Sequence, residues 1–137
     1  MVKISGLGAA PDCVIQTGLE HDQVERLANG LVLVCTFLRP SMMMFNLAAE
    51  SQADTRDGRI HSTAEDGRLS WGHPLDVAAV AAVALTEPGP ESKTYHITGS
   101  ESLSFDDLAE RRGRLLMAAI GSHPNQPEAG RDRFLAQ

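Results

Sequence analysis

An apolar run over residues 31–38, Leu-Val-Leu-Val-Cys-Thr-Phe-Leu, constrains the fold of this chain more than any other feature. A strand with one face in water alternates apolar and polar side chains, whereas a strand covered on both faces stays apolar along its length. Interior strands of parallel sheets that lie between helices have the second pattern. The run therefore predicts a strand buried on both faces, and an α/β fold.

The residues before this run predict the rest of a strand–helix–strand unit. Residues 2–5 are expected to form a short strand, and residues 19–28 a helix. Thr17 and Glu20 have the spacing of a capping box, in which two side chains bind free amides at a helix start. The two strands should be parallel, with the helix packed across them in a right-handed crossover.

Later segments predict further elements of the same kind. Ser41 and Asp76 are candidate N-caps, and the helix after Asp76 is so rich in apolar residues that we expect it to be buried. Helices are expected at residues 42–51 and 77–86, and strands at residues 59–61 and 94–98. Ser104 and Asp107 have capping-box spacing at the start of a last helix. After Gly121, polar and helix-breaking residues predict disorder.

Composition and spacing exclude several classes of function. The net charge is -6 over 137 residues, without the clustered basic face that binding to a nucleic-acid backbone needs. The longest apolar run, residues 77–85, is shorter than the ~20 residues that span a bilayer. The two cysteines and the scattered histidines lack a metal-ligand spacing, so no metal site is expected. We expect a cytoplasmic protein without a nucleic-acid or membrane partner.

Several stretches, taken in order, resemble one known family. They are residues 2–9, His21 with Glu25, residues 38–41 with 45–47, residues 76–82 and residues 93–99. In this order they resemble the C-terminal portion of an NAD(P)-binding protein of the NmrA-like, atypical short-chain dehydrogenase family. The resemblance covers residues 1–109, and residues 110–137 are expected to form a helix end and a disordered tail.

The resemblance implies a partial Rossmann-like parallel sheet with flanking helices, without the N-terminal strands that carry the dinucleotide loop. It implies NADP or NAD as the cofactor and a small molecule as the substrate. The loop from Gly6 to Pro11 lacks the third glycine and the immediate helix that hold a pyrophosphate. We therefore expect a truncated chain that binds NADPH and NADH poorly or not at all. An exposed sheet edge would offer a surface for self-association or for a partner chain.

Two groups of candidate site residues follow from the resemblance. Arg39, Pro40 and Ser41 follow the apolar core of the buried strand and would line the nicotinamide side of the cofactor. Phe45 and Asn46 would face the substrate pocket. The alternatives are that Pro40 only ends the strand and that Phe45 belongs to the core.

His21 is the one candidate for a catalytic proton donor. The Tyr-x-x-x-Lys of classical short-chain dehydrogenases is absent, because the single tyrosine, Tyr95, follows Lys93 at the wrong spacing. A histidine titrates near neutral pH, which suits proton transfer to a substrate oxygen. The alternative is that His21 only faces solvent, one helical turn from Glu25.

Three functions remain open at this point. The first is an NAD(P)H-dependent reductase of quinones or other small carbonyl compounds, as the resemblance implies. The second is a non-catalytic dinucleotide-sensing or regulatory protein, and the third is an inactive remnant of the fold. The missing pyrophosphate loop counts against the first two alike, and dinucleotide binding would separate them from the third.

Overall fold

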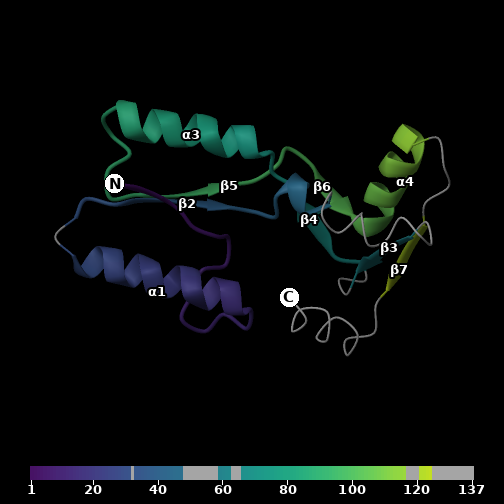
Figure 1. The fold of residues 1–137 in the computed structure, drawn as a ribbon, viewed down its shortest axis with the longest axis horizontal. Coiled ribbons are helices and arrows are strands. Elements are labelled where there is room, and N and C mark those ends of the chain that lie inside the picture. Colours follow the sequence, from purple (N-terminus) through teal and green to yellow (C-terminus); the bar gives the residue numbers. More distant parts are fainter. Residues whose placement is uncertain (32, 48–58, 63–65, 117–120, 125–137) are drawn as a thin grey trace. The chain divides into compact units, whose positions relative to one another are not determined.

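The computed structural model describes residues 1–31, 33–47, 59–62, 66–116 and 121–124 (Figure 1). The chain divides into two compact units. The first consists of residues 1–45 and 70–100, and the second of residues 46–69 and 101–137. None of the described helices is both long enough and apolar enough to cross a bilayer.

The first unit is a three-stranded parallel sheet with a helix on either side. The strands are β1 (Val2–Ile4), β2 (Thr36–Pro40) and β5 (Thr94–Ile97), in the order β1-β2-β5. Helix α1 (Gln16–Gly30) connects β1 to β2, and α3 (Pro74–Thr86) precedes β5. Figure 1 shows α1 and α3 on opposite sides of the strands. The predicted parallel pairing of the first two strands, and the predicted strand near residue 94, are confirmed.

Strand β2 carries the core of this unit because successive side chains of a strand point to opposite faces. Leu38 faces one helix, and Phe37 faces the other. The cluster on the α1 side contains Ala28, Cys35 and Phe37, and the cluster on the α3 side contains Leu38, Val77 and Ile97. Burial of this segment on both faces is thus confirmed for its second half.

The prediction of a strand is wrong for the first half of residues 31–38. β2 begins at Thr36, and the side chains of Leu33 and Val34 are 50% and 57% exposed. Residue 31 still belongs to the end of α1, where its amide donates to the carbonyl of Leu27 at 3.2 Å. β1 begins at Val2, whose partner in the ladder is Thr36, so earlier residues of the run have no strand to pair with.

The predicted start of α1 is also wrong. The helix begins at Gln16 after the N-cap Ile15, which has no side-chain cap, so Thr17 and Glu20 do not form a capping box. Instead, the side-chain amide of Gln16 donates to the Glu20 carboxylate at 2.9 Å. Glycine at position 18 allows close packing of the first turn, because an added Cβ would lie 2.3 Å from the sulfur of Cys13.

Helix α3 differs from its prediction in two ways. His73 is the N-cap, since its Nδ1 accepts a hydrogen bond from the Leu75 amide at 3.2 Å, and Asp76 lies in the first turn, where the helix dipole favours an acidic group. The expected burial of the whole helix is wrong, because Leu75 and Leu85 are 70% and 68% exposed. Only the side that carries Val77 packs on the sheet.

Residues 44–47 are helical, as predicted for the helix at 42–51, and residues 48–51 lie outside the described part of the chain. The other elements among the described residues are two pairs of strands and a helix. They are β3 (Arg59–Ser62) parallel to β7 (Gly121–Pro124), β4 (Arg68–Ser70) paired with β6 (Ser102–Ser104), and α4 (Phe105–Leu116). The strand predicted near residue 60 is confirmed. The predicted disorder is wrong for residues 122–124, which lie in β7, and residues 125–137 lie outside the described part of the chain.

The capping box at the start of α4 is confirmed. The Asp107 amide donates to the Ser104 hydroxyl at 3.1 Å, and the Ser104 amide donates to the Asp107 carboxylate at 2.9 Å. We expect Ser104→Ala to lower the free energy of unfolding by about 1 kcal/mol, the usual loss for an N-cap. Urea denaturation would measure this, with Ser102→Ala on the exposed side of β6 as the control. Equal stability of the two variants would contradict the cap's contribution.

Candidate functional site

The carboxyl ends of the parallel strands bring three loops of the first unit together. The amide of Ser5 donates to the carbonyl of Leu38 at 2.7 Å, and the amide of Leu7 donates to the carbonyl of Pro40 at 2.9 Å. The amide of Ser41 donates to the carbonyl of Ile97 at 2.8 Å. Ligands of open α/β sheets bind outside this edge of the sheet. These hydrogen bonds therefore place the loop after β1 beside the end of β2 at the edge where a ligand is expected.

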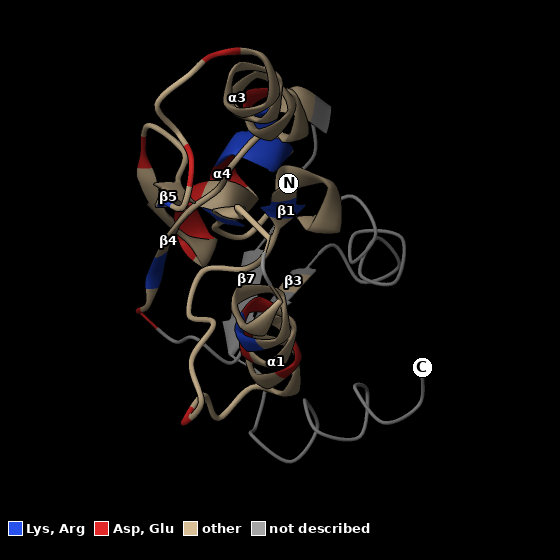
Figure 2. Cartoon of the chain, turned by 90° about the vertical axis from the view of Figure 1, so that its left-hand side faces the viewer, with Lys and Arg blue, Asp and Glu red and all other residues tan. Residues whose placement is uncertain are grey.

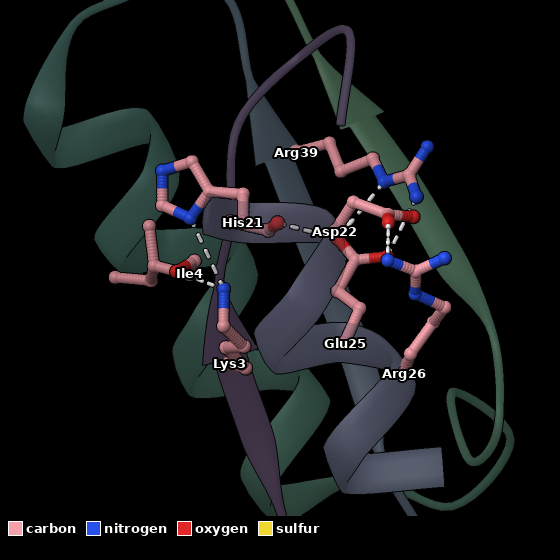
Figure 3. Close-up of polar contacts among 8 residues, drawn as sticks. Lys3, Ile4, His21, Asp22, Glu25, Arg26 and Arg39 are labelled. Carbon is pink, nitrogen blue, oxygen red and sulfur yellow. Dashed lines mark hydrogen bonds and ion pairs between the residues drawn. The ribbon is translucent and has the colours of Figure 1, made fainter. Parts of the chain in front are cut away.

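His21 projects from α1 to this same edge. Its ring lies against Gly6, where an added Cβ would be 2.8 Å from the ring's Cδ2, so a larger residue at position 6 would displace the ring. The His21 Nδ1 lies 3.2 Å from the Nζ of Lys3 on β1 (Figure 3). The side chain is half-buried. The polar contact of the His21 side chain is thus with Lys3 and not with Glu25, and its role as a proton donor stays a prediction.

The surroundings of His21 favour its neutral form. Burial lowers the pKa of His21, and the positive charge of Lys3 lowers it further, whereas Glu25 and Glu20 raise it. The net pKa lies below the ordinary value of a histidine. At neutral pH the ring is therefore an imidazole with one N–H donor and one acceptor nitrogen.

Glu25 is the centre of a polar cluster beneath the site (Figure 3). Its carboxylate accepts two hydrogen bonds from Arg39, Nε to Oε1 at 3.0 Å and a terminal nitrogen to Oε2 at 2.6 Å. The Ser5 hydroxyl donates to the same Oε1. Glu25 is only 4% exposed. Two-pronged contact of this kind fixes both planar groups, so the cluster joins α1 to the ends of β1 and β2.

The contacts of Glu25 determine its ionisation. Burial raises the pKa of this carboxyl, but the hydrogen bonds from Arg39 and Ser5 outweigh burial, and the pKa lies below its ordinary value. The sequence indicates Glu25 only as part of a family pattern and does not reveal its partners. A signal was present: Arg39 is two residues from Phe37, and residues two apart on a strand face the same helix.

The structure places Arg39, Pro40 and Ser41 at the expected edge, but their polar groups are occupied. The Arg39 guanidinium is held by Glu25. The Ser41 hydroxyl donates to the carbonyl of Ser70 at 2.5 Å, so the predicted helix cap by this side chain is wrong. Proline has no amide hydrogen to offer. These residues can form a wall against a ligand, while their own hydrogen bonds stay within the chain.

The two predicted pocket residues fall in different units. Phe45 is 56% exposed at the end of the first unit, so its assignment to the core is wrong. Asn46 begins the second unit, and its role in a pocket stays a prediction. Among the residues that the structure describes, no three acidic, histidine or cysteine side chains are grouped closely enough to hold a metal ion.

The loop after β1 does not fit a pyrophosphate. Gly8 has a φ of +86°, which bends the loop back on itself. The amide of Ala9 donates to the carbonyl of Gly6 at 3.2 Å, and the amide of Leu7 is bound to Pro40. A phosphate-binding loop presents free amides at a helix start. Here two of the loop's amides are already used inside the chain.

Charged residues of both signs lie together on α1 (Figure 2). The Arg26 guanidinium lies 2.8 Å from the carboxylate of Asp22, one turn away. Glu20 and Glu25 add negative charge along the same helix. The helix therefore has no one-signed basic surface of the kind that attracts a polyanion.

Comparison with known proteins identifies relatives. No protein-family model matches the chain. It is similar to an NAD(P)H azoreductase from Xenophilus azovorans, with 35% identity over 108 residues. This match covers 79% of the chain and 38% of the azoreductase. The chain spans less than half the length of the relatives it matches.

Solved structures agree with the sequence comparison. An NADPH-dependent quinone oxidoreductase from Escherichia coli matches with a TM-score of 0.83 and 26% identity, over 94% of this chain and 46% of that one. A nucleoside-diphosphate-sugar epimerase from Staphylococcus aureus matches with a TM-score of 0.82 and 19% identity, over 93% and 46% of the two chains, a likeness of fold alone. The predicted Rossmann-like parallel sheet with flanking helices is confirmed. The predicted resemblance to the NmrA-like, atypical short-chain dehydrogenase family is confirmed, because the relatives are NAD(P)H-dependent oxidoreductases, and the chain matches less than half of their length.

Proposed function

We propose that this chain provides the nicotinamide side of an NAD(P)H-dependent reductase that acts on quinones or other small carbonyl compounds. The position of His21 carries the proposal, because it lies at the carboxyl edge of the sheet beside the loop that is bonded to Pro40. The similarity to an NAD(P)H azoreductase and to an NADPH-dependent quinone oxidoreductase supports the choice of cofactor and substrate class.

Each residue at the carboxyl edge of the sheet would have a separate role in such a site. The cofactor, NADP or NAD, would supply the hydride. Pro40 and Ser41 would form the wall beside the nicotinamide, and the Glu25–Arg39 pair would keep α1 and β2 in place beneath it. His21 would bind the substrate oxygen through its ring N–H, and the proton that completes the reduction would come from solvent. A hydrogen bond aimed at the oxygen on which charge develops stabilises the transition state of carbonyl reduction.

We further propose that the chain by itself binds a whole dinucleotide weakly. In Rossmann folds the pyrophosphate is held by a glycine-rich loop at a helix start, and a nearby acidic or basic residue recognises the adenosine ribose. The bonded amides of Leu7 and Ala9 do not provide such a loop. The chain would then correspond to the C-terminal portion of its relatives, with the adenosine side supplied elsewhere.

Two halves of the cofactor provide the test. Reduced nicotinamide mononucleotide and adenosine bisphosphate would each be added to the chain at millimolar concentration, and the backbone amides followed by NMR. We expect the nicotinamide compound to shift the amide signals of Gly6, Leu7 and Ser41. Adenosine bisphosphate should leave them in place, because no pyrophosphate or ribose contact is expected here. The amides of residues 83–86, at the far end of α3, serve as the internal control.

Other outcomes of this titration separate the parts of the proposal. A nicotinamide site at this edge would be contradicted if only adenosine bisphosphate shifted these amide signals, or if neither compound shifted them. Tight binding of intact NADPH, saturating at micromolar concentration, would leave the cofactor assignment standing and overturn the proposed weak binding.

A non-catalytic dinucleotide sensor is the second candidate. The absence of a Tyr-x-x-x-Lys pair favours it, since Tyr95 lies on β5 and Lys93 precedes it by two residues. A sensor would give the same amide shifts with reduced nicotinamide mononucleotide. It would not oxidise this compound when a quinone is added, whereas a reductase would, as the loss of nicotinamide absorbance would report.

A further inference from the structure

Lys3 and His21 form a polar contact that the reductase proposal does not use. The Nζ of Lys3 lies 3.2 Å from the Nδ1 of His21, and 3.4 Å from the carbonyl oxygen of Ile4 (Figure 3). Lys3 is the middle residue of β1, and its side chain is directed toward α1. The contact therefore joins β1 to α1 through Lys3 and His21. The His21 ring also lies against Gly6, in the loop that follows β1.

The chemistry of the two groups fixes which nitrogen carries the proton. A lysine ammonium has three donors and no acceptor. A ring nitrogen beside it at hydrogen-bond distance must then be the acceptor. While Lys3 carries its charge, the Nδ1 of His21 would therefore be the unprotonated nitrogen, and the neutral ring would carry its hydrogen on Nε2.

The other ring nitrogen lies on the opposite side, next to the loop after β1. A Cβ added at Gly6 would be 3.3 Å from Nε2, so the absence of a side chain at this position leaves room beside the donor. Among the described residues, Nε2 makes no hydrogen bond. The N–H is thus available to a ligand at the carboxyl edge.

The charged groups around the ring leave Lys3 as the one that sets the tautomer. Glu20 and Glu25 on α1 act on the ring through their charge, as does Lys3 on β1. The Glu25 carboxylate is occupied by Arg39 and Ser5, and Glu20 binds Gln16. Neither carboxylate hydrogen-bonds the His21 ring.

We propose that Lys3 is a positioning residue that holds His21 as the neutral Nε2–H tautomer, so that the ring donates a hydrogen bond to a carbonyl or quinone oxygen at the edge of the sheet. The identity of the ligand rests on the proposed function, whereas the tautomer does not. Under this assignment His21 is a neutral hydrogen-bond donor. The developing negative charge on the substrate oxygen is then stabilised by the Nε2–H of a neutral ring and not by a charged imidazolium. The lowered pKa of His21 agrees with a ring that stays neutral at pH 7.

Exchanging the donor at position 3 for an acceptor provides the sharpest test. In Lys3→Glu a carboxylate would replace the ammonium, and Nδ1 would become the protonated nitrogen. Ring nitrogen and carbon NMR signals, assigned with a His21→Gln variant, report the tautomer directly. We expect mainly Nε2–H in the unaltered chain and mainly Nδ1–H in Lys3→Glu, with the pKa of His21 raised in the variant.

Two further variants separate positioning from a general structural role. Lys3→Arg keeps a donor and should keep the Nε2–H tautomer. Lys3→Met removes the donor and should raise the pKa of His21 while the amide spectrum stays that of the folded chain. An unchanged tautomer in Lys3→Glu, in a folded chain, would overturn the proposal. None of these measurements needs a cofactor, so a failure of nicotinamide binding would leave their outcome unaffected.

Discussion

Glu25→Ala is expected to lower the free energy of unfolding by about 3–5 kcal/mol, the range for removing one partner of a buried ion pair. Glu25 is 4% exposed, and its removal would leave the Arg39 guanidinium without its carboxylate in a largely covered position. The Ser5 hydroxyl would lose its acceptor as well. The loss in stability is large because the guanidinium that remains is charged and shielded from water. It exceeds the net contribution of the intact ion pair to the free energy of unfolding.

Urea denaturation of three variants would check this expectation. Glu20→Ala is the matched control, because Glu20 lies on the exposed side of the same helix, where its partner is Gln16. The double variant Glu25→Leu/Arg39→Met should lose less stability than Glu25→Ala, since it leaves no unpaired charge. If Glu25→Ala were as stable as the control, the cluster would not hold α1 to the sheet.

The same cluster determines how stability responds to acid. The folded-state pKa of Glu25 lies below its ordinary value, so the contribution of this carboxylate is complete above the unfolded-state pKa of about 4.3. It is lost as the pH falls further, through the folded-state pKa. In the Glu25→Leu/Arg39→Met variant, stability should therefore fall less steeply below pH ~4.3 than in the unaltered chain.

Leu38→Ala is expected to lower the free energy of unfolding by about 2–5 kcal/mol, the range for a buried leucine cut back to alanine. Leu38 is 0% exposed and packs with Val77 of α3 and Ile97 of β5. The smaller side chain would lose these contacts and leave a cavity between the sheet and α3, because a packed core closes such a space only in part.

A leucine on the outer side of α3 provides the control for this substitution. Leu85 is 68% exposed, and Leu85→Ala should change stability by no more than about 0.5 kcal/mol. Both variants remove the same atoms, so the difference between them reports burial together with the smaller effect of alanine's preference for helix over strand. A large loss from Leu85→Ala would mean that this side of α3 is covered in solution, and a small loss from Leu38→Ala would contradict the two-sided core of β2.

Some features that depend on neighbours in the sequence were predictable, although the expected caps at Thr17, Ser41 and Asp76 did not form. The capping box of Ser104 and Asp107 needs only two side chains three residues apart, and it forms as expected. The parallel pairing of β1 with β2 followed from an apolar segment separated from the first strand by a helix. The position of Pro40 at the carboxyl end of β2 followed from its missing amide hydrogen.

Features that depend on register and on packing were decided only by the tertiary structure. β2 begins at Thr36 rather than residue 31, because a strand extends only as far as its neighbour offers pairing partners, and β1 begins at Val2. The apolar composition of α3 predicted burial, but a helix is covered only where another element meets it, and one side of α3 meets the sheet.

The candidate site illustrates the same division. The family resemblance indicated His21 as a catalytic candidate, and the end of the apolar strand placed Arg39 and Pro40 at the carboxyl edge of the sheet. It did not indicate that Arg39 binds Glu25 or that Lys3 binds His21. These contacts join residues 14 and 18 positions apart, and they form only when α1 lies across the two strands in one particular register.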